Sequence, residues 1–227
     1  NEFKRVIAIF KDISGGKINR TNVKAFLQVY RYYALIARLE GDYTNAITWY
    51  TEMLNVAAKY NVNIDRARYY QEIADCNIEL RKYNIALENI NRADRIIDKD
   101  DAREYWIHNL DARLFGFIPL PLFDFGDIAV VGEGRIFREF DLETKALYSL
   151  ALKEKIHYSK GDYRSVVKVH KDKLKILEGK NRIIHNEIRL RTLNNLGHAY
   201  FILSDYKQSI KYFNEAWKTA DDLNNNE

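Results

Sequence analysis

Four histidines in the second half of the chain are the first candidates for chemistry, because they recur at spacings of 13, 15 and 13 residues. Imidazole is a common zinc ligand, and a helical zinc site places two ligands at i and i+4 on one face. None of these spacings gives such a pair, so the pattern favours histidines in the core or on the surface. The sequence therefore predicts no metal site and no cofactor. The four residues are His157, His170, His185 and His198.

Catalytic motifs are also not found in the sequence. Gly132-Glu133-Gly134 resembles a phosphate-binding loop only superficially, since neither G-x-G-x-x-G nor G-x-x-x-x-G-K-[ST] follows, and a turn is the simpler interpretation. The single cysteine, Cys76, forms no internal disulfide and belongs to no C-x-x-C or Cys/His pattern. No carboxylate lies in the glycine-rich or strand-end setting that is typical of acid–base catalysis. We expect a protein that is not an enzyme.

The composition favours a helical protein. Hydrophobic residues make up 47% of the 227 residues, enough for a core, and 30% are charged. Only two prolines and ten glycines occur, whereas a β-sandwich of this length needs more turn residues.

The sequence also bears on the compartment. One cysteine fits a reducing environment, and no apolar run reaches the roughly 18 residues that span a bilayer. The chain opens at Asn1 without a methionine, and no signal peptide is visible. We expect a cytoplasmic chain that is a processed product or a piece of a longer protein.

A short motif built around tyrosine recurs along the chain. GDYTNAITWY at 41–50 and SDYKQSIKYF at 204–213 share a small residue, Asp-Tyr, a gap and an aromatic residue. Two further copies centre on Tyr83 and Tyr163, and Gly126-Asp127-Ile128 stands in the longer gap between them. The five copies lie 40, 45, 35 and 43 residues apart. This period predicts a repeat architecture.

Each copy separates two helical patterns. Before the motif, apolar or small residues recur at spacings of three and four, as at 193, 196, 197 and 200, and they do so again after it, as at 210, 213, 216 and 217. The Gly-Asp or Ser-Asp pair ends one helix, and its aspartate caps the next by accepting a bond from a backbone amide. Each unit is then a helical hairpin that buries its apolar face only by stacking on a neighbour. The sequence therefore predicts an all-α solenoid.

These positions resemble the tetratricopeptide repeat family, whose pattern is W-x2-L-G-x2-Y, then A-x3-F, then A. In the last repeat the pattern falls on Leu193, Leu196, Gly197, Tyr200, Ser209, Phe213 and Ala216. Around Tyr83 it falls on Tyr70, Ile73, Ala74, Asn77, Ala86, Ile90 and Ala93. Around Tyr43 it falls on Tyr30, Tyr33, Ala34, Ala37, Ala46, Tyr50 and Met53. Around Tyr163 the match is weak, because Glu154 replaces the small residue and Val166 the alanine.

The resemblance implies a right-handed superhelix of about five hairpins. Repeats of 40 residues or more, against 34 in the family pattern, are similar to the long-repeat forms in bacterial peptide-responsive regulators, kinesin light chains and the regulatory arms of signalling or protease proteins. We expect residues 1–19 to form an N-terminal helix or the remnant of a preceding repeat, residues 20–223 the superhelical domain, and residues 224–227 a polar tail.

The middle copy departs most from the pattern, with an irregular segment at 117–135. Prolines stand where its first helix should end, and glycines lie within its second. It is either a degenerate repeat or a β-hairpin insertion, and we favour the degenerate repeat. An exposed IPLPLF stretch there is a plausible docking surface.

The family resemblance also implies a binding groove. In this family the first helix of each hairpin lines a concave surface that holds a peptide, and arginine, tyrosine and asparagine suit a peptide with carboxylate groups. By position, the groove residues are Gln28, Arg31, Leu35, Arg38, Arg68, Gln71, Asp75, Ile78, Tyr148, Lys155, Tyr158, Arg191, Asn194, His198 and Phe201. The carboxylate clamp of some members is not matched, because Arg31, Leu35 and Glu72 stand where it has Lys, Asn and Asn. We expect a protein- or peptide-binding scaffold within a larger protein.

A basic segment leaves two other functions open. Residues 143–192 carry 13 basic and six acidic side chains, within a chain whose net charge is +4. A nucleic-acid-associated or transcription-regulating role is one alternative. However, the lysines at 168, 171, 173 and 175 alternate with apolar residues as on the solvated side of an amphipathic helix, and no helix-turn-helix element is apparent. Regulatory repeats of a protease or kinase are the other alternative. The oligomeric state is not predicted.

Overall fold

The structure, a computed structural model, describes residues 17–97, 141–179 and 183–224 of the chain. In these ranges it has eight α-helices and no strand, which confirms the all-α prediction. The chain divides into two compact units, Asn1–Phe123 and Asp124–Glu227.

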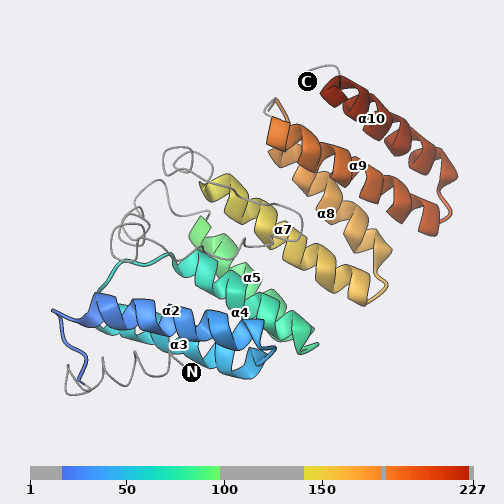
Figure 1. Ribbon diagram of the computed structural model, residues 1–227. Coiled ribbons are helices and arrows are strands. Elements are labelled where there is room, and N and C mark those ends of the chain that lie inside the picture. Colours follow the sequence, from blue (N-terminus) through green and yellow to red (C-terminus); the bar gives the residue numbers. More distant parts are fainter. Residues whose placement is uncertain (1–16, 98–140, 180–182, 225–227) are drawn as a thin grey trace. The chain divides into compact units, whose positions relative to one another are not determined.

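The first unit contains two helical hairpins. The helices are α2 (Val23–Leu39), α3 (Tyr43–Lys59), α4 (Arg66–Glu79) and α5 (Tyr83–Ile97). α2 packs on α3 and α4 on α5, and α3 packs on α4 to join the hairpins (Figure 1, blue to green). Each hairpin thus covers an apolar face of the next, as a helical repeat requires.

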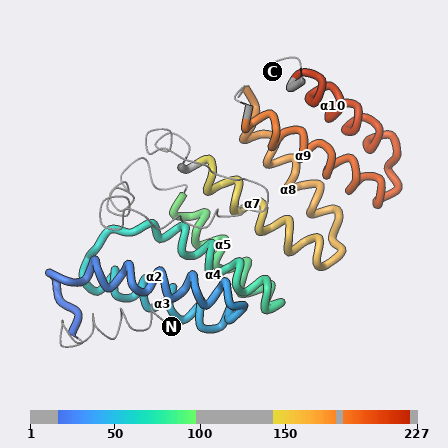
Figure 2. Tube along the Cα trace, in the orientation of Figure 1, coloured from blue at the N-terminus to red at the C-terminus, as the bar shows by residue number. Residues whose placement is uncertain are grey.

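The second unit has the same arrangement. It contains α7 (Asp141–Ser159), α8 (Tyr163–Ile176), α9 (Ile183–Ile202) and α10 (Tyr206–Asn224). α7 packs on α8 and α9 on α10, and α8 packs on α9 (Figure 2, yellow to red). In both units the second helix of one hairpin therefore contacts the first helix of the next.

The tyrosine motif marks the same turn in all four described hairpins. Tyr43, Tyr83, Tyr163 and Tyr206 are each the first residue of the second helix, after a three-residue turn. One turn residue has a positive φ in every case: Gly41 (77°), Arg81 (57°), Gly161 (67°) and Ser204 (62°). Such a residue at a helix C-terminus lets the chain reverse while its amides satisfy the last carbonyls. The bonds of Gly41 N to Arg38 O and of Asp42 N to Ala37 O are an example.

Aspartate caps the second helix in three of these hairpins, as predicted. The carboxylate oxygens of Asp42, Asp162 and Asp205 accept bonds from the backbone amides three residues on, at 3.1, 3.2 and 3.2 Å. In the hairpin around Tyr83 this position is Lys82, whose side chain has no acceptor oxygen. The Gly-Asp and Ser-Asp pairs therefore act both as helix stop and as helix start.

The small residues of the repeat pattern sit where helices touch. Ala34 and Ala74 are fully buried, as are Ala46, Ala86 and Ala93 of the second helices. A Cβ added to Gly197 would lie 2.9 Å from ring carbons of Phe213, closer than such atoms approach each other. These contacts confirm why the pattern requires small side chains.

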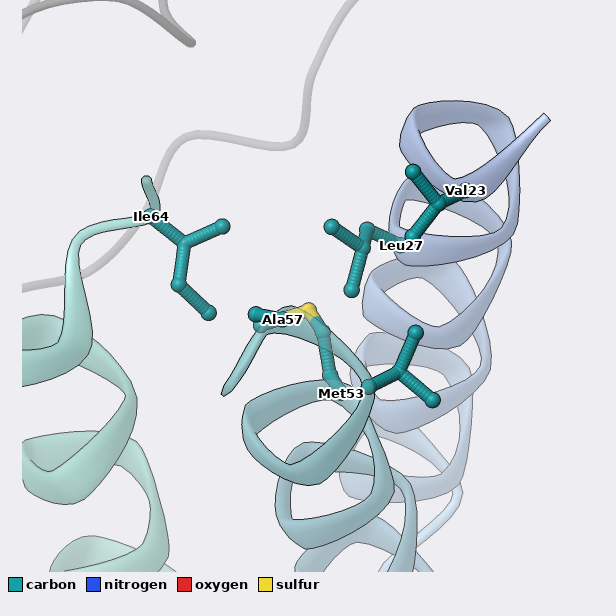
Figure 3. Packing of buried hydrophobic residues seen from close by; sticks show 6 residues of the cluster. Val23, Leu27, Met53, Ala57 and Ile64 are labelled. Carbon is teal, nitrogen blue, oxygen red and sulfur yellow. The ribbon is translucent and has the colours of Figure 1, made fainter. Parts of the chain in front are cut away.

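The apolar core is assembled from successive helices. One cluster in the first unit joins Val23 and Leu27 of α2, Met53 and Ala57 of α3, and Ile64 just before α4 (Figure 3). Residues three or four positions apart share a helix face, so each helix contributes a pair. The core thus extends from one hairpin into the next.

Several predictions fall outside the described residues. They are the middle copy around Gly126-Asp127-Ile128, the irregular segment 117–135, and most of the segments expected at 1–19 and 224–227. The degenerate repeat, the β-hairpin alternative, the fifth hairpin and the right-handed superhelix stay predictions.

Candidate functional site

One face of α9 carries the last four predicted groove residues. Arg191, Asn194, His198 and Phe201 are all exposed, and their spacing of three, four and three places them on one side of the helix. The opposite side is buried, with Leu196 and Ala199 packed against α8. α9 therefore presents a cationic, an amide, an imidazole and an aromatic side chain in a single row.

α7 contributes the other predicted residues of the second unit. Lys155 is exposed, whereas Tyr148 and Tyr158 are half-buried. The Tyr158 ring packs edge-on against Tyr163 and His170, at centroid distances of 5.8 and 6.5 Å. Burial, with the Glu154 carboxylate adding to it, raises the pKa of Tyr158 to about 12. The phenol is therefore a neutral hydrogen-bonding group at physiological pH.

The predicted groove residues of the first unit are less accessible. Gln28, Arg31, Leu35 and Arg38 of α2 and Arg68 of α4 are half-buried. Gln71 and Asp75 of α4 are buried, at 0% and 8% exposure, as is Ile78. The structure thus places these α4 side chains inside the unit, away from a surface that a ligand could reach.

An ion-pair network explains why α4 buries its charges. Arg38 of α2 pairs with Glu72, and its Nη2 lies 2.6 Å from Asp75 Oδ2. Arg68 Nε lies 2.7 Å from Glu72 Oε1. Two arginines and two carboxylates therefore balance one another between the first helices of neighbouring hairpins. A buried charge is stable only when it is paired in this way.

Sequence reasoning missed this network because it treated the positions as independent. Arg38 is separated from Glu72 by 34 residues and from Asp75 by 37. The signal that could have predicted this network is a pair of opposite charges separated by nearly one repeat period, with both residues on the first helices of their hairpins. Arg38 thus joins α2 to α4 through Glu72 and Asp75, and Arg68 pairs with Glu72 from within α4.

A second polar cluster lies in the second unit, between α7, α8 and α9. Glu154 pairs with Lys173, and its Oε1 lies 3.5 Å from both His170 Nε2 and Asn195 Nδ2. His170 is fully buried. Burial lowers the pKa of His170 to about 4, against the opposing effect of the Glu154 carboxylate and with a smaller contribution from Lys173. His170 is therefore neutral at physiological pH.

Three members of this cluster occupy repeat-pattern positions. Glu154, His170 and Lys173 stand in this hairpin where the last repeat has Gly197, Phe213 and Ala216. Lys173 is only 12% exposed at its side chain, so it does not belong to the solvated side on which we expected it. The weak match around Tyr163 pointed to Glu154, but the simultaneous replacement of its two partners was not predicted.

Two of the other histidines also have carboxylate neighbours. His185 Nε2 lies 3.1 Å from Glu143 Oε1, and His157 Nδ1 lies 3.3 Å from Asp162 Oδ2. In the part of the chain that the structure describes, no three His, Cys, Asp or Glu side chains gather as a metal site would need. His170 and His185 are buried among the helices, and His198 is exposed.

The basic segment forms a row on α8. Arg164, Lys168, Lys171 and Lys175 are exposed at spacings of four, three and four residues. Lys171 Nζ lies 5.6 Å from the centroid of the Tyr200 ring, and its hydrogen bond to Tyr200 raises the pKa of the ammonium. This row is a cationic surface separate from the row on α9.

Comparisons with known proteins agree with this architecture. Residues 190–221, which lie on α9 and α10, match the family described as Tetratricopeptide repeat. The crystal structure of BtubC (BKLC) from P. vanneervenii resembles the chain with a TM-score of 0.58 at 14% sequence identity, covering 99% of this chain and 75% of that one. No curated protein matches the sequence. Among the described helices, none has the length and apolar character that crossing a bilayer requires.

Proposed function

We propose that this helical repeat protein of the tetratricopeptide type is a non-catalytic scaffold that binds an extended peptide along the first helices of its hairpins. Repeats of this type generally bind proteins or peptides, and the matched residues 190–221 include the whole exposed row of α9. That row, formed by Arg191, Asn194, His198 and Phe201, is the observation that carries the proposal.

The side chains indicate the chemistry of the ligand. Arg191 and Lys155 supply positive charge, and an arginine holds a carboxylate with two parallel bonds. Asn194 both donates to and accepts from a peptide backbone, and Phe201 offers apolar surface. These groups suit an extended peptide that carries an acidic side chain or its own C-terminal carboxylate.

The first unit contributes shape more than charge. Its Arg38 and Arg68 are balanced by Glu72 and Asp75, so little unbalanced charge remains there to attract a ligand. In the proposal, Gln28, Arg31 and Leu35 extend the contact surface of α2. Gln71 and Asp75 support it from within.

The test is a binding titration with fluorescently labelled acidic peptides, with and without a free C-terminal carboxylate. We expect Arg191→Ala to weaken binding by about 10- to 100-fold, since a hydrogen bond to a charged group is worth about 1.5–3 kcal/mol. Asn194→Ala should weaken binding less, because its bonds are neutral. Arg164→Ala on α8 is the matched control and should leave the affinity unchanged.

Two results contradict the proposal. One is equal affinity of the wild type and the Arg191→Ala variant for every peptide that binds. The other is loss of binding in the Arg164→Ala control alone. Either would move the ligand away from α9, while circular dichroism spectra of all variants show whether the helices are intact.

The α8 row favours a second candidate, binding of a nucleic acid. Arg164, Lys168, Lys171 and Lys175 supply four cationic groups on one exposed face. Affinity for phosphate backbones falls steeply with salt, with a logarithmic slope of about −0.9 for each phosphate neutralised on duplex DNA. Two results would support this candidate: binding of DNA that disappears as the salt concentration rises, and loss of DNA binding in the double variant Lys168→Ala/Lys171→Ala.

The proposal places the chain in the cytoplasm, within a larger protein. It assigns no cofactor and no catalytic residue to the chain.

A further inference from the structure

The outer face of α10 carries a row of exposed apolar side chains. They are Tyr206, Ile210, Phe213 and Trp217, with exposures of 56, 61, 39 and 72%. Their spacing of four, three and four residues puts them on one side of the helix, which we call the α10 ridge. On the other side, Ser209 and Ala216 are buried, and Tyr212 stacks on Tyr200 of α9 at 5.5 Å.

In two of the other second helices, α3 and α8, the same positions pack against the helix that follows. In α3 they are Tyr43, Ile47, Tyr50 and Leu54, which belong to a cluster with Ile73 and Cys76 of α4. In α8 the second and fourth of these positions are Val167 and Leu174, which pack with Leu196 and Ala199 of α9. The α10 ridge is therefore a helix-docking face by its place in the repeat.

The area of the ridge is large enough to matter. Aromatic side chains bury about 150–250 Å² each when covered, so the four partly exposed residues present on the order of 400–500 Å². The largest apolar patch on a typical monomer covers about 300–600 Å² and is often functional. Two such faces together approach about 1,000 Å², the lower limit of a specific interface.

The charges beside the ridge indicate what covers it. The amino-terminal half of α10, up to residue 214, carries Lys207 and Lys211, and the carboxy-terminal half carries Glu215, Asp221 and Asp222 with one lysine, Lys218, so the first half is net basic and the second net acidic. Within one copy Lys211 Nζ lies 3.8 Å from Glu215 Oε1. Two α10 helices in antiparallel orientation bring the basic half of each against the acidic half of the other. A parallel orientation would place like charges together. The helix is thus complementary to itself about a two-fold axis, the geometry of an isologous dimer.

We propose that two copies of this chain associate through their α10 ridges, with the α10 helices antiparallel. The pairing covers Ile210, Trp217 and the exposed part of Phe213, whose ring also packs against Gly197 of α9. Because the contact is self-complementary, it closes at two copies and does not propagate. Phe201 of the α9 row contacts Tyr206 at 5.7 Å, so the dimer contact begins where the proposed peptide row ends.

The test measures the mass of the full chain in solution by sedimentation over a wide range of protein concentration. The wild type should move from 26.8 kDa to twice that mass as concentration rises. Ile210→Glu and Trp217→Glu should each raise the dissociation constant at least tenfold, because a charge then replaces apolar surface at the contact. Ile85→Glu, at an apolar position of α5 that is 47% exposed, is the control and should dimerise like the wild type.

A charge-reversal cycle tests the antiparallel orientation. Lys207→Glu combined with Lys211→Glu should weaken the dimer, because both halves of α10 are then acidic. Adding Asp221→Lys and Asp222→Lys should restore it, because the opposite charges are exchanged. Failure to restore overturns the antiparallel pairing.

A chain that stays at the monomer mass at every concentration overturns the whole proposal, and so does a dimer unaffected by Trp217→Glu. In those cases the ridge is the site of a different partner, such as a helix of another protein. Binding of acidic peptides to α9 is read from a separate titration, so neither result depends on the other.

Discussion

At the scale of single residues, the hairpin of α7 and α8 has a polar contact between its two helices, where the repeat pattern has an apolar one. In the last hairpin Gly197, Phe213 and Ala216 occupy the contact positions, whereas the hairpin of α7 and α8 has Glu154 and its partners there. A carboxylate in that place is stable only with a cation and hydrogen-bond donors beside it. Lys173 supplies the cation and Asn195 an amide donor, while the neutral His170 ring packs beside the carboxylate, so the substitutions form a matched set.

The buried histidine makes the stability of the second unit depend on pH. His170 has a pKa of about 4 in the folded chain, against an ordinary value of 6.5 when unfolded. Between these values the unfolded chain binds a proton that the folded chain does not. The stability that the second unit gains from holding His170 neutral is therefore fully present above pH 6.5, and it is lost as the pH falls towards 4. It amounts to about 3 kcal/mol in the free energy of unfolding.

Urea titrations between pH 7 and pH 4 test this dependence. His170→Gln should flatten the pH dependence of the unfolding free energy, because the neutral side chain takes up no proton. His198→Gln is the control, since His198 is exposed and its removal should leave the slope as in the wild type. An unchanged slope in His170→Gln would mean that His170 is already charged in the fold.

Gly197 tests the close approach of α9 and α10. Alanine is favoured over glycine inside a helix by about 1 kcal/mol. However, its Cβ would lie 2.9 Å from ring carbons of Phe213, and overpacking of this kind costs about 1–3 kcal/mol. We expect Gly197→Ala to lower the unfolding free energy by about 1 kcal/mol in urea titrations. In a Phe213→Ala background the same change should be neutral or stabilising, and additive effects would contradict the steric explanation.

At the scale of elements, the hairpin turns share one design with one exception. Three turns place glycine or serine at the left-handed position and aspartate next to it, whereas the turn between α4 and α5 has Arg81 and Lys82. A left-handed backbone costs a residue with a Cβ about 1–2 kcal/mol. Lys82 also lacks the oxygen with which aspartate caps the second helix. This turn is therefore the least favourable of the four.

Installing Gly-Asp in that turn should stabilise the first unit. Arg81→Gly removes the cost of the left-handed backbone in the folded chain. Glycine also gives the unfolded chain more conformational freedom, which takes back about 0.4–1 kcal/mol of that gain. Lys82→Asp adds a cap worth about 1 kcal/mol. We expect the double variant to raise the unfolding free energy by about 1–2 kcal/mol in urea titrations. The reciprocal change, Asp42→Lys in the first turn, should lower it, and equal stability of all three proteins would contradict the capping argument.

The turns and the buried repeat positions are also where the sequence was most informative. Tyr43, Tyr83, Tyr163 and Tyr206 predicted where the second helices begin, because a turn needs particular residues in a short span. The partners of Arg38 and of Glu154 could not be predicted in the same way. These partners lie on other helices. The charged residues that pair are 19 to 37 positions apart in the sequence, so the pairing becomes evident only once the helices are placed side by side. For the same reason the predicted groove included Asp75 as a ligand contact.

At the scale of the whole molecule, stability should be divided between the two units. In a helical repeat each hairpin contacts only its neighbours, so the effect of a change fades along the chain. Cys76, the single cysteine, is a natural reporter of the first unit, since it is fully buried against α3. Burial also raises the pKa of its thiol to about 12, so it reacts with thiol reagents only when α4 opens.

A pair of matched core variants tests this division. Ile90 of α5 and Leu196 of α9 are both fully buried, and truncating such a side chain to alanine costs about 2–5 kcal/mol. Under native conditions Ile90→Ala should speed the labelling of Cys76 about 30-fold or more, because about 2 kcal/mol of local stability is lost. Leu196→Ala should leave the labelling rate within a few-fold of the wild type, although it destabilises the second unit. Equal acceleration by both variants would show that the chain opens as one cooperative body, because opening of α4 would then require the second unit to unfold as well.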